Sequence, residues 1–569
     1  MQPILYSICD RLKLNERRLF KLLNVNTASF NHKLQGTVRM NKSELFLGDE
    51  ALAQGALDAG ISGAYAYPGT PSTEILEYIQ SLPETAENSV HCDWSSNEKT
   101  AMEEALGMSY AGKRAIACMK HVGLNVAADA FVNSAITGAN GGLIVIVADD
   151  PSMHSSQNEQ DTRFYAKFAG VPLLEPANQQ EAYDMVFAGF ELSEKMKLPV
   201  IIRLTTRLAH SRGNVIRKDK LQQNEIQYPE DDRQFILLPA NARRNYDALI
   251  EKQKELTSLS NSSEYNTLNL GAENSEMGII ATGIAINYVA ELFGGRDAIP
   301  YPYLAVRQYP IPAQQIQEIF SKCDKILFVE EGAPFIEEMA CGILPNDLKI
   351  SGRLDGTLPR TGELNPDAVA KALGIATEGV AQLPEVCKPR PPQLCKACPH
   401  IDSYNFINEI IAADANTRVF ADIGCYTLGA LPPYNAIHTT VDMGASITMA
   451  KGAADAGVHP SLAVIGDSTF GHSGITGLLD ACYENTKMVV LILDNDTTAM
   501  TGTQDSIVAN GILDKLVNGC GVNPENVHVL NPLPKNHEEN TVTLKKAIDQ
   551  DGVSVIIARR PCIQIRRSN

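Results

Sequence analysis

The length and composition indicate a globular protein of several domains. A chain of 569 residues exceeds what one hydrophobic core organises, and it predicts about three to four domains of roughly 150 residues each. Hydrophobic residues make up 44% and charged residues 20%, so the chain can bury substantial cores. The formal net charge of -18 argues against a nucleic-acid partner, because a polyanion is bound by clustered Lys and Arg. We therefore expect small molecules and other proteins as partners.

The sequence gives no sign of a membrane segment or a secretory leader. No uninterrupted apolar run is long enough to span a bilayer, and residues 1–40 lack the compact apolar core of a signal peptide. These forty residues are basic and nearly free of acids, so over 1–43 we expect an N-terminal extension. An upstream start or a loosely ordered tail is favoured over a targeting leader. We expect a cytoplasmic protein. Because the cytoplasm is reducing, some of the protein's twelve cysteines are better candidates for metal ligands than for disulfides.

Strands alternate with helices in three parts of the chain, which predicts an α/β fold. Runs such as GGLIVIVAD and LPVIIRLTT alternate with helical stretches in the first part and indicate a parallel sheet. MGIIATG and KILFVEE indicate a smaller unit, and TRVFADIG, SLAVIGDS, KMVVLILDN and VSVIIARR indicate a third. The predicted limits are 44–212 for the first unit, 213–275 for a linker, 276–375 for the second unit, 376–394 for a Pro-rich linker and 395–569 for the third.

The third unit contains a pattern typical of a phosphate and metal site. SLAVIGDS (461–468) predicts a strand that leads through a loop to a helix at about 474–485, and KMVVLILDN (487–495) predicts the next strand, so Asp467 and Asn495 end neighbouring strands. Ligands of an open α/β sheet bind at this edge, where helix N-termini offer donors to phosphate. Carboxylate and amide oxygens suit Mg²⁺. Gly-Asp-Ser alone is more often a plain turn, but the Asn on the second strand and the TTAMTG that follows favour a metal site.

This spacing resembles the thiamine diphosphate signature of Gly-Asp-Gly, a spacer and Asn. Ser468 stands where the signature has its second glycine. The resemblance implies that thiamine diphosphate is bound at Gly466, Asp467 and Ser468. It also implies that Asp467 and Asn495 ligate Mg²⁺ through their side chains and Thr497 through its backbone carbonyl.

A thiamine enzyme also needs a carboxylic acid against the aminopyrimidine ring, and Glu98 is the candidate. In SSNEKTAMEEALGMSYAGKR a helix begins at Glu98. The segment resembles the pyrimidine-domain helix of pyruvate and 2-oxoacid:ferredoxin oxidoreductases, which implies that Glu98 is the activating acid. Glu103 and Glu104 are the rivals, although a single glutamate more often lies on a solvated helix face. The resemblance favours Glu98, because its position next to Asn97 at the helix start matches the family and the positions of Glu103 and Glu104 do not.

Three further side chains are candidates for the substrate pocket. In YPGTPSTE (67–74), Thr70 and Ser72 precede a helix that they could cap, and they could offer donors to an anion. The loop resembles the family's Tyr-Pro-x-Thr-Pro loop, which implies that Thr70 contacts the substrate carboxylate; capping is the alternative, and both can hold. His121, near a strand end, and His472, beside the metal motif, are candidate proton donors or polar contacts, or are merely hydrogen-bonded histidines.

Four of the cysteines have a spacing that indicates a metal centre. LCKACPH contains Cys395 and Cys398, GCYTLG contains Cys425, and ARRPC ends at Cys562. Four thiolates can hold a [4Fe–4S] cluster, and the ends of neighbouring strands converge in space. Structural zinc is the alternative, because it also binds four thiolates. The pattern resembles the proximal cluster site of 2-oxoacid:ferredoxin oxidoreductases. The other eight cysteines are expected to be ordinary thiols.

Longer strings extend the resemblance over about 44–565. DDPSMHSSQNEQDTRFYAKFAGVPLLEP, GRLDGTLPRTGELNP and GDSTFGHSGITGLL resemble the large (alpha) subunit of indolepyruvate:ferredoxin oxidoreductases. The resemblance implies two doubly wound parallel-sheet cofactor domains, for pyrimidine over 44–212 and for diphosphate over 395–569, and a smaller α/β domain like the transketolase C-terminal domain over 276–375.

The same resemblance implies an activity and its partners. The implied reaction is the oxidative decarboxylation of an arylpyruvate to aryl-acetyl-CoA and CO₂, with CoA as co-substrate. Electrons would pass through the [4Fe–4S] cluster to ferredoxin. A smaller (beta) subunit would complete the CoA site, so we expect a hetero-oligomer or a homodimer with no nucleic-acid and no membrane partner.

The sequence departs from this family in two places. Large subunits commonly end in a domain with two CxxCxxCxxxCP runs, and this sequence ends at Asn569 without one, so a single cluster is expected. Electrons would then leave directly from that cluster, through another polypeptide, or not at all. TGTQDS stands where Thr-Gly-Gly-Gln-Pro is commoner, which alters the loop near the cofactor but not the metal ligands. Two other functions stay open: a non-oxidative thiamine-dependent decarboxylase or carboligase, and a non-catalytic cofactor-binding subunit.

Overall fold

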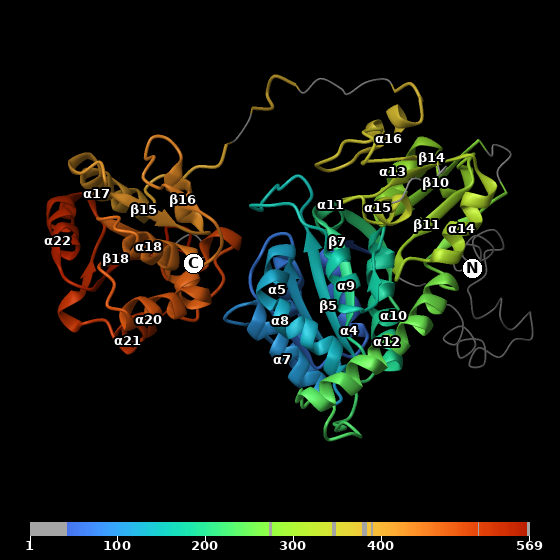
Figure 1. Ribbon diagram of the computed structural model, residues 1–569, viewed down its shortest axis with the longest axis horizontal. Helices are drawn as coiled ribbons and strands as arrows, with labels where there is room; N and C mark the ends of the chain where they lie inside the picture. Colours follow the sequence, from blue (N-terminus) through green and yellow to red (C-terminus); the bar gives the residue numbers. More distant parts are fainter. Residues whose placement is uncertain are drawn as a thin grey trace, which may run out of the picture.

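Three sheet-centred units make up the protein. The computed structural model describes residues 43–271, 276–343, 349–377, 384–388, 391–509 and 511–565. In Figure 1 the first unit, blue to cyan, lies between the middle unit, green to yellow, and the last unit, orange to red. The N-terminal extension predicted over 1–43 lies, except for its last residue, outside the described residues.

The first unit is built on a seven-stranded sheet in the order β12–β6–β7–β5–β4–β2–β3. Neighbouring strands are parallel except for the pair β12 and β6. The central strand β5, with the sequence LIVIVAD, is buried along its whole length, as a parallel sheet covered by helices requires. The strands are β2 (Gly63–Ala66), β3 (His91–Trp94), β4 (Ala115–Lys120), β5 (Leu143–Asp149), β6 (Leu173–Leu174), β7 (Val200–Thr205) and β12 (Gln308–Tyr309).

Helices cover both faces of this sheet, and a small antiparallel pair lies beside it. The helices are α4 (Gly48–Asp58), α5 (Thr73–Ser81), α6 (Pro83–Glu87), α7 (Glu98–Tyr110), α8 (His121–Thr137), α9 (Thr162–Ala169), α10 (Gln179–Met196) and α11 (Thr206–His210). The pair consists of β1 (Ser43–Leu47) and β8 (Arg212–Ile216). The junctions at α7 and α8, each of which follows a strand of the sheet, form the edge where the candidate site lies.

The middle unit has a five-stranded sheet in the order β14–β13–β10–β11–β9, with only β9 antiparallel to its neighbour. Its strands are β9 (Thr267–Asn269), β10 (Met277–Thr282), β11 (Tyr303–Val306), β13 (Lys325–Val329) and β14 (Lys349–Ser351). The helices are α12 (Pro239–Asn261), which leads into the unit, α13 (Ala285–Leu292), α14 (Ala313–Lys322), α15 (Phe335–Cys341) and α16 (Pro366–Ala372).

Several ion pairs are buried where the first unit meets the middle one, and one of them joins the two units. Arg203 on β7 pairs with Asp149 at 2.6 Å, and Arg163 on α9 pairs with Asp161 at 2.6 Å. Arg163 also reaches Glu330, which follows β13 of the middle unit, at 2.7 Å. These side chains are almost fully buried, so each charge depends on its partner for the solvation that water would otherwise give.

The last unit has a six-stranded sheet that is parallel throughout, in the order β16–β15–β17–β18–β20–β19. Its strands are β15 (Arg418–Ala421), β16 (Thr439–Thr440), β17 (Ser461–Gly466), β18 (Met488–Asp494), β19 (Val527–Leu530) and β20 (Val553–Arg559). The helices are α17 (Pro399–Ala413), α18 (Ala445–Asp455), α19 (Asp467–Thr469), α20 (Ile475–Tyr483), α21 (Ile512–Gly519) and α22 (His537–Asp549).

The predicted fold class is confirmed, but one predicted boundary is less sharp than expected. The segment 213–275, expected to be a linker, contributes β9 to the middle sheet, while β12 from the middle segment pairs with β6 of the first sheet. The first and middle units are therefore joined by the pairing of β12 with β6 as well as by the connecting chain. The other limits stay predictions, and the Pro-rich linker over 376–394 lies partly outside the described residues.

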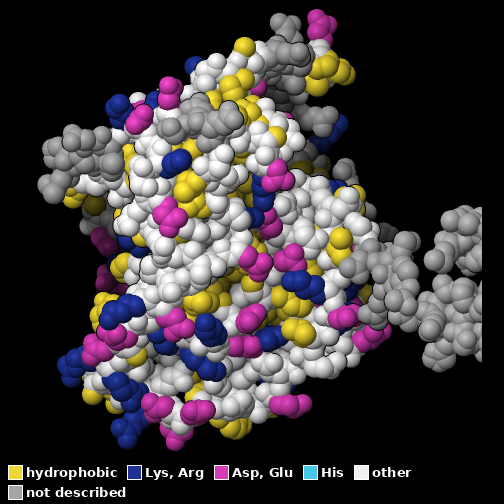
Figure 2. Space-filling model, turned by 90° about the vertical axis from the view of Figure 1, so that its right-hand side faces the viewer, with side chains coloured by type: hydrophobic (Ala, Val, Ile, Leu, Met, Phe, Trp, Pro, Cys, Tyr) yellow, Lys and Arg dark blue, Asp and Glu magenta, His cyan; other side chains and the backbone are white. Residues whose placement is uncertain are grey.

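The surface and the helices agree with the composition. Within the described ranges, no helix combines the length and the apolar character needed to cross a bilayer. On the face shown in Figure 2, Lys and Arg side chains are interspersed with Asp and Glu.

Candidate active site

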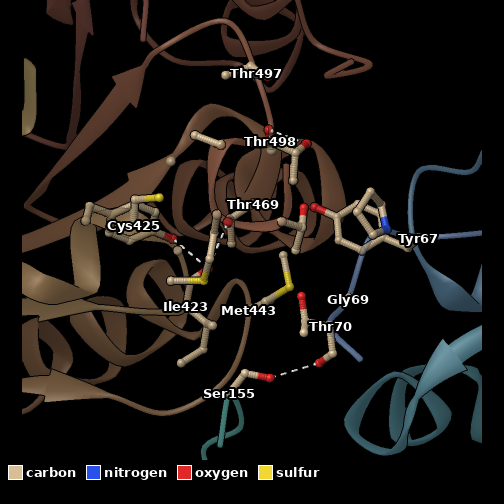
Figure 3. A pocket seen from close by; sticks show the side chains of 18 of the residues that line it. Tyr67, Gly69, Thr70, Ser155, Ile423, Cys425, Met443, Thr469, Thr497 and Thr498 are labelled. Atoms are coloured by element: carbon tan, nitrogen blue, oxygen red, sulfur yellow. Dashed lines mark hydrogen bonds between the residues drawn. The ribbon is translucent and has the colours of Figure 1, made fainter. Parts of the chain in front are cut away.

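A cavity lies where the first unit meets the last one, and most of the predicted site residues line it. Figure 3 shows Thr497 and Thr498 on one side of this cavity, Gly69, Thr70 and Ser155 on the other, and Cys425 at its edge. The first unit contributes the loop after β2 and the start of α7, and the last unit contributes the ends of β17 and β18. The predicted residues that line it are Thr70, Glu98, Cys425, Gly466, Asp467, Ser468, Asn495 and Thr497.

Asp467 and Asn495 lie at the ends of adjacent parallel strands, β17 and β18. Asp467 is 2% exposed, and its Oδ2 atom has no hydrogen-bond partner among the described residues. Burial raises the pKa of the Asp467 carboxyl to about 8, and repulsion from Asp494 and Asp496 adds to this. A buried, unpaired carboxylate beside other acids fits a site for a divalent cation, because such a cation supplies the missing positive charge.

Asn495 and Thr497 complete this group of oxygen atoms. Thr497 donates its backbone N–H to Oδ1 of Asn495 at 3.2 Å, and its hydroxyl donates to the carbonyl of Gln504 at 2.9 Å. The amide of Asn495 lies 3.4 Å from Nε2 of His400. Burial lowers the pKa of His400 to about 4, so this ring is neutral at pH 7 and can accept from the amide.

Glu98 reaches the cavity from the other unit. Asn97 caps α7 by accepting from the N–H of Thr100 at 2.9 Å, and its amide donates to the carbonyl of His472 at 3.0 Å. The carboxylate of Glu98 lies 2.8 Å from Nε2 of His472. The start of α7 is thus held against the last unit, so that Glu98 and Asp467 share one cavity. The rivals Glu103 and Glu104 are exposed and do not line it.

The two predicted histidines are not among the side chains that line this cavity, and their contact with the substrate stays a prediction. His121 is turned to Asn158, whose backbone and side-chain oxygens lie 3.1 Å from its Nε2 atom. His472 lies behind Glu98, with the ring of Tyr67 against its own at 4.6 Å. His472 can therefore orient Glu98, whereas His121 is a hydrogen-bonded histidine of the buried interior.

The predicted cap of α5 is also different in the structure. Neither Thr70 nor Ser72 caps the helix with its side chain: Ser72 donates its hydroxyl to the carbonyl of Gly69 at 2.8 Å instead. Thr73 accepts from the N–H of Gly69 at 3.0 Å. These bonds close the loop on itself and leave Thr70 at the wall of the cavity.

The four predicted cysteines gather around a second cavity that adjoins the first. Cys395, Cys398, Cys425 and Cys562 all line it, and Cys425 and Asn495 line both cavities. The backbone N–H of Cys562 donates to the carbonyl of Asn495 at 2.9 Å. The end of β20 is thereby tied to the end of β18, where the proposed metal ligand lies.

Burial determines the protonation state of two of these thiols when no metal is bound. Burial raises the pKa of Cys425 to about 12 and that of Cys398 to about 11, and the neighbouring thiols contribute in the same direction. Such thiols stay protonated unless a metal supplies positive charge, and thiolate is the form that binds metals. The set of four thiols in one cavity fits an iron–sulfur cluster or a zinc ion.

Two residues of this site were missed by sequence reasoning. Gly123 on α8 makes room for Glu98, since a Cβ atom there would lie 2.6 Å from Oε1 of that carboxylate. Lys120, the last residue of β4, lines the cavity beside Gly69. Both residues lie in the string MKHVGLN, which begins at the end of a predicted strand. The end of that strand could have identified them, because residues at the carboxyl ends of parallel strands lie at the edge of the sheet where ligands bind.

Comparisons with known proteins agree with this arrangement. Residues 54–250 match the family described as "Pyruvate flavodoxin/ferredoxin oxidoreductase, thiamine diP-bdg", and residues 422–558 match "Thiamine pyrophosphate enzyme, C-terminal TPP binding domain". The indolepyruvate oxidoreductase subunit IorA of Archaeoglobus fulgidus is 40% identical over 550 residues, which cover 91% of this chain and 86% of that protein. The chain belongs to the indolepyruvate oxidoreductase IorA family.

A second IorA subunit and one solved structure are also similar to this chain. The IorA subunit of Thermococcus kodakarensis is 37% identical over 91% of this chain and 85% of its own length. A solved 2-oxoglutarate:ferredoxin oxidoreductase from Magnetococcus marinus aligns with a TM-score of 0.47 and 16% identity. The alignment covers 58% of this chain and 65% of the chain of that enzyme. Glu98 falls in the segment that matches the pyruvate flavodoxin/ferredoxin oxidoreductase family, and Asp467 and Asn495 fall in the segment that matches the thiamine pyrophosphate enzyme family.

Proposed function

We propose that this chain is the thiamine-diphosphate-binding subunit of an enzyme that oxidatively decarboxylates an arylpyruvate, with indolepyruvate as the first candidate. The products are the aryl-acetyl-CoA and CO₂, and ferredoxin accepts the electrons. The observation that carries the proposal is one cavity lined by Glu98 of the first unit and by Asp467 and Asn495 of the last. The relatives' printed name, indolepyruvate oxidoreductase, supports this choice of substrate.

The residues of the cavity fit the two ends of this cofactor. Bound thiamine diphosphate supplies carbanion chemistry for breaking a bond beside a carbonyl. Asp467, Asn495 and the backbone carbonyl of Thr497 would offer oxygen ligands to Mg²⁺ at the diphosphate end. Glu98 would exchange a proton with the pyrimidine ring, and His472 holds that carboxylate in position from 2.8 Å.

The cysteine cavity supports an oxidative rather than a non-oxidative reaction. Cys395, Cys398, Cys425 and Cys562 would hold a [4Fe–4S] cluster, and Cys425 borders the cofactor cavity itself. Electrons would then cross a short distance to leave the reacting centre. The relatives are named as subunits, which supports a smaller partner subunit, and we propose that this partner completes the CoA site and that ferredoxin docks on the complex.

The test is turnover by the complex of this chain with its smaller partner subunit, purified without oxygen. With indolepyruvate, CoA, thiamine diphosphate and Mg²⁺, we expect reduction of a viologen dye and formation of the acyl-CoA in equal proportion to CO₂. Release of an aldehyde without dye reduction would instead identify a non-oxidative decarboxylase. No consumption of any 2-oxoacid, with cofactor bound, would identify a non-catalytic subunit.

A further inference from the structure

Lys120 stands out among the residues that line the cofactor cavity because of its charge. It is the one Lys or Arg among the described residues that line this cavity, whereas Glu98 and Asp467 contribute carboxylates. The proposed roles of the Mg²⁺ ligands and of the activating acid Glu98 do not require a cation at this position. The presence of Lys120 in the cavity therefore needs another explanation. The substrate class, by contrast, carries one full negative charge on its carboxylate.

Contacts with Gly69 and Ser155 hold Lys120 in the wall of the cavity that the first unit forms. It ends β4, and its side-chain stem packs on the backbone of Gly69, where a Cβ atom would come within 3.2 Å of its Cδ atom. Its ammonium donates to the carbonyl of Ser155 at 3.0 Å. Ser155 in turn donates its hydroxyl to the carbonyl of Thr70 at 3.1 Å, a bond drawn in Figure 3. The ammonium and Thr70 are thus joined through one residue.

The ammonium has unused capacity for a ligand. An ammonium has three donors, and the one hydrogen bond recorded for Lys120 among the described residues uses only one of them. The acids nearest to Lys120 have other hydrogen-bond partners. Asp150 accepts from Ser155, Ser156 and Thr206 at 2.7–2.8 Å. Glu98 contacts His472. Burial lowers the pKa of Lys120 to about 8, against the opposing attraction of Asp150 and Glu98.

We propose that Lys120 binds the carboxylate of the 2-oxoacid substrate, an inference that rests on the proposed function of this cavity. The carboxylate would lie between the ammonium of Lys120 and the Thr70 loop, with the 2-oxo carbon directed toward the cofactor. A charged pair in a partly desolvated cavity is stronger than one in water, so it can select acids over neutral analogues. The pair forms in the ground state, so Lys120 contributes to capture more than to the chemical step.

The test compares an acid with its neutral isostere, without turnover. Binding of indole-3-propionate and of indole-3-propionamide to the cofactor-loaded complex is measured by calorimetry for wild type, Lys120→Gln and Lys120→Arg. We expect Lys120→Gln to weaken binding of the acid by about 10- to 100-fold, as loss of a charged hydrogen bond does, and to leave binding of the amide unchanged. Lys120→Arg, which keeps the charge, recovers part of the loss. Lys195→Gln, on the exposed side of α10, is the control and changes neither.

Turnover gives the second measurement, because uniform binding affects KM and not kcat. In Lys120→Gln we expect the KM for indolepyruvate to rise by the same factor with little change in kcat. Equal weakening of acid and amide, or no weakening of either, would overturn the proposal, since a merely structural lysine does not distinguish charge. If wild type binds the acid through Lys120 but converts no 2-oxoacid, the proposed function fails and the anion site stands.

Discussion

At the scale of single residues, Asp467 is the most direct link between the sequence motif and the cofactor. Its buried, unpartnered oxygen is the feature that a bound cation would satisfy. We expect Asp467→Asn to lower the affinity for thiamine diphosphate with Mg²⁺ by at least about 100-fold. Loss of a residue that only hydrogen-bonds to a metal ligand costs roughly 10- to 100-fold in affinity, and loss of a charged ligand itself should cost more. Calorimetry measures this, with the exposed Asp480→Asn as control. Unchanged affinity in Asp467→Asn would contradict the motif assignment.

Asp49 gives a prediction about pH. It is fully buried at the start of α4, and neither of its carboxylate oxygens has a hydrogen-bond partner among the described residues. Burial raises the pKa of Asp49 well above its usual value, and repulsion from Glu74 and Glu50 adds to this. The folded state therefore holds a proton there more tightly than the unfolded state does. The stability that this contributes is present below the unfolded pKa of about 3.9 and is lost as the pH rises toward the folded pKa.

Replacing Asp49 by Asn removes this dependence, because the amide mimics the protonated acid. We expect Asp49→Asn to be more stable than wild type at pH 8, with a smaller difference at pH 5. Thermal unfolding at both pH values measures it. Glu74 and His210 lie close enough to share a cation with Asp49. The hydrogen bond to Glu74 raises the pKa of His210, so His210 also contributes to the pH dependence, and the variant is compared with wild type at each pH. A variant less stable than wild type at pH 8 would refute the prediction, and a rise in wild-type melting temperature with Zn²⁺ would show a metal there instead.

At the scale of helices and strands, the packing of α7 against α8 sets the position of Glu98. We expect Gly123→Ala to reduce turnover about 100-fold, as a misplacement of about 1 Å can do, because the added Cβ atom must displace the Glu98 carboxylate. Cofactor binding at Asp467 should persist. Gly107→Ala on α7 is the matched control: nothing lies within 4 Å of its Cβ position, so it should stabilise the helix by roughly 0.5–1 kcal/mol and keep full activity. Equal activity of both variants would show that Glu98 does not depend on Gly123.

The sequence predicts long buried strands well and short pairings poorly. The runs that form β5 and β18 are continuous and apolar, and they suffice to identify strands of a covered parallel sheet. By contrast, β6 and β12 have two residues each, and their pairing is a tertiary contact between two units. Two residues contain no periodicity from which such a contact could be read.

The candidate site was predictable to a similar extent. Residues with a fixed spacing at strand ends, such as Asp467 and Asn495, meet because parallel strands end at one edge of a sheet. Lys120 and His121 show where this reasoning stops: they are adjacent in sequence, yet Lys120 lines the cavity and His121 turns into the interior. Consecutive side chains at the end of a strand point in different directions, and only packing decides which one faces the ligand.

At the scale of the whole molecule, the account depends on two units that build one site. Contacts from Asn97 and Glu98 to His472 hold the first unit against the last, and the cysteine cavity lies on the far side of Asn495. The cavities proposed for the cofactor and for the electron acceptor are thereby adjacent, as an oxidative reaction requires. Loss of one of the four thiols should remove the proposed acceptor and spare cofactor binding, because Asp467 and Glu98 do not line the cysteine cavity.

The measurement that tests this most directly is the iron, sulfide and thiamine diphosphate content of the oxygen-free complex, for wild type and for Cys425→Ala. We expect about four irons and four sulfides bound by this chain in wild type, which a [4Fe–4S] cluster holds, and dye reduction by indolepyruvate. Cys425→Ala should lose the cluster and the dye reduction while it retains thiamine diphosphate. Stoichiometric zinc in wild type, or full dye reduction by Cys425→Ala, would contradict the account.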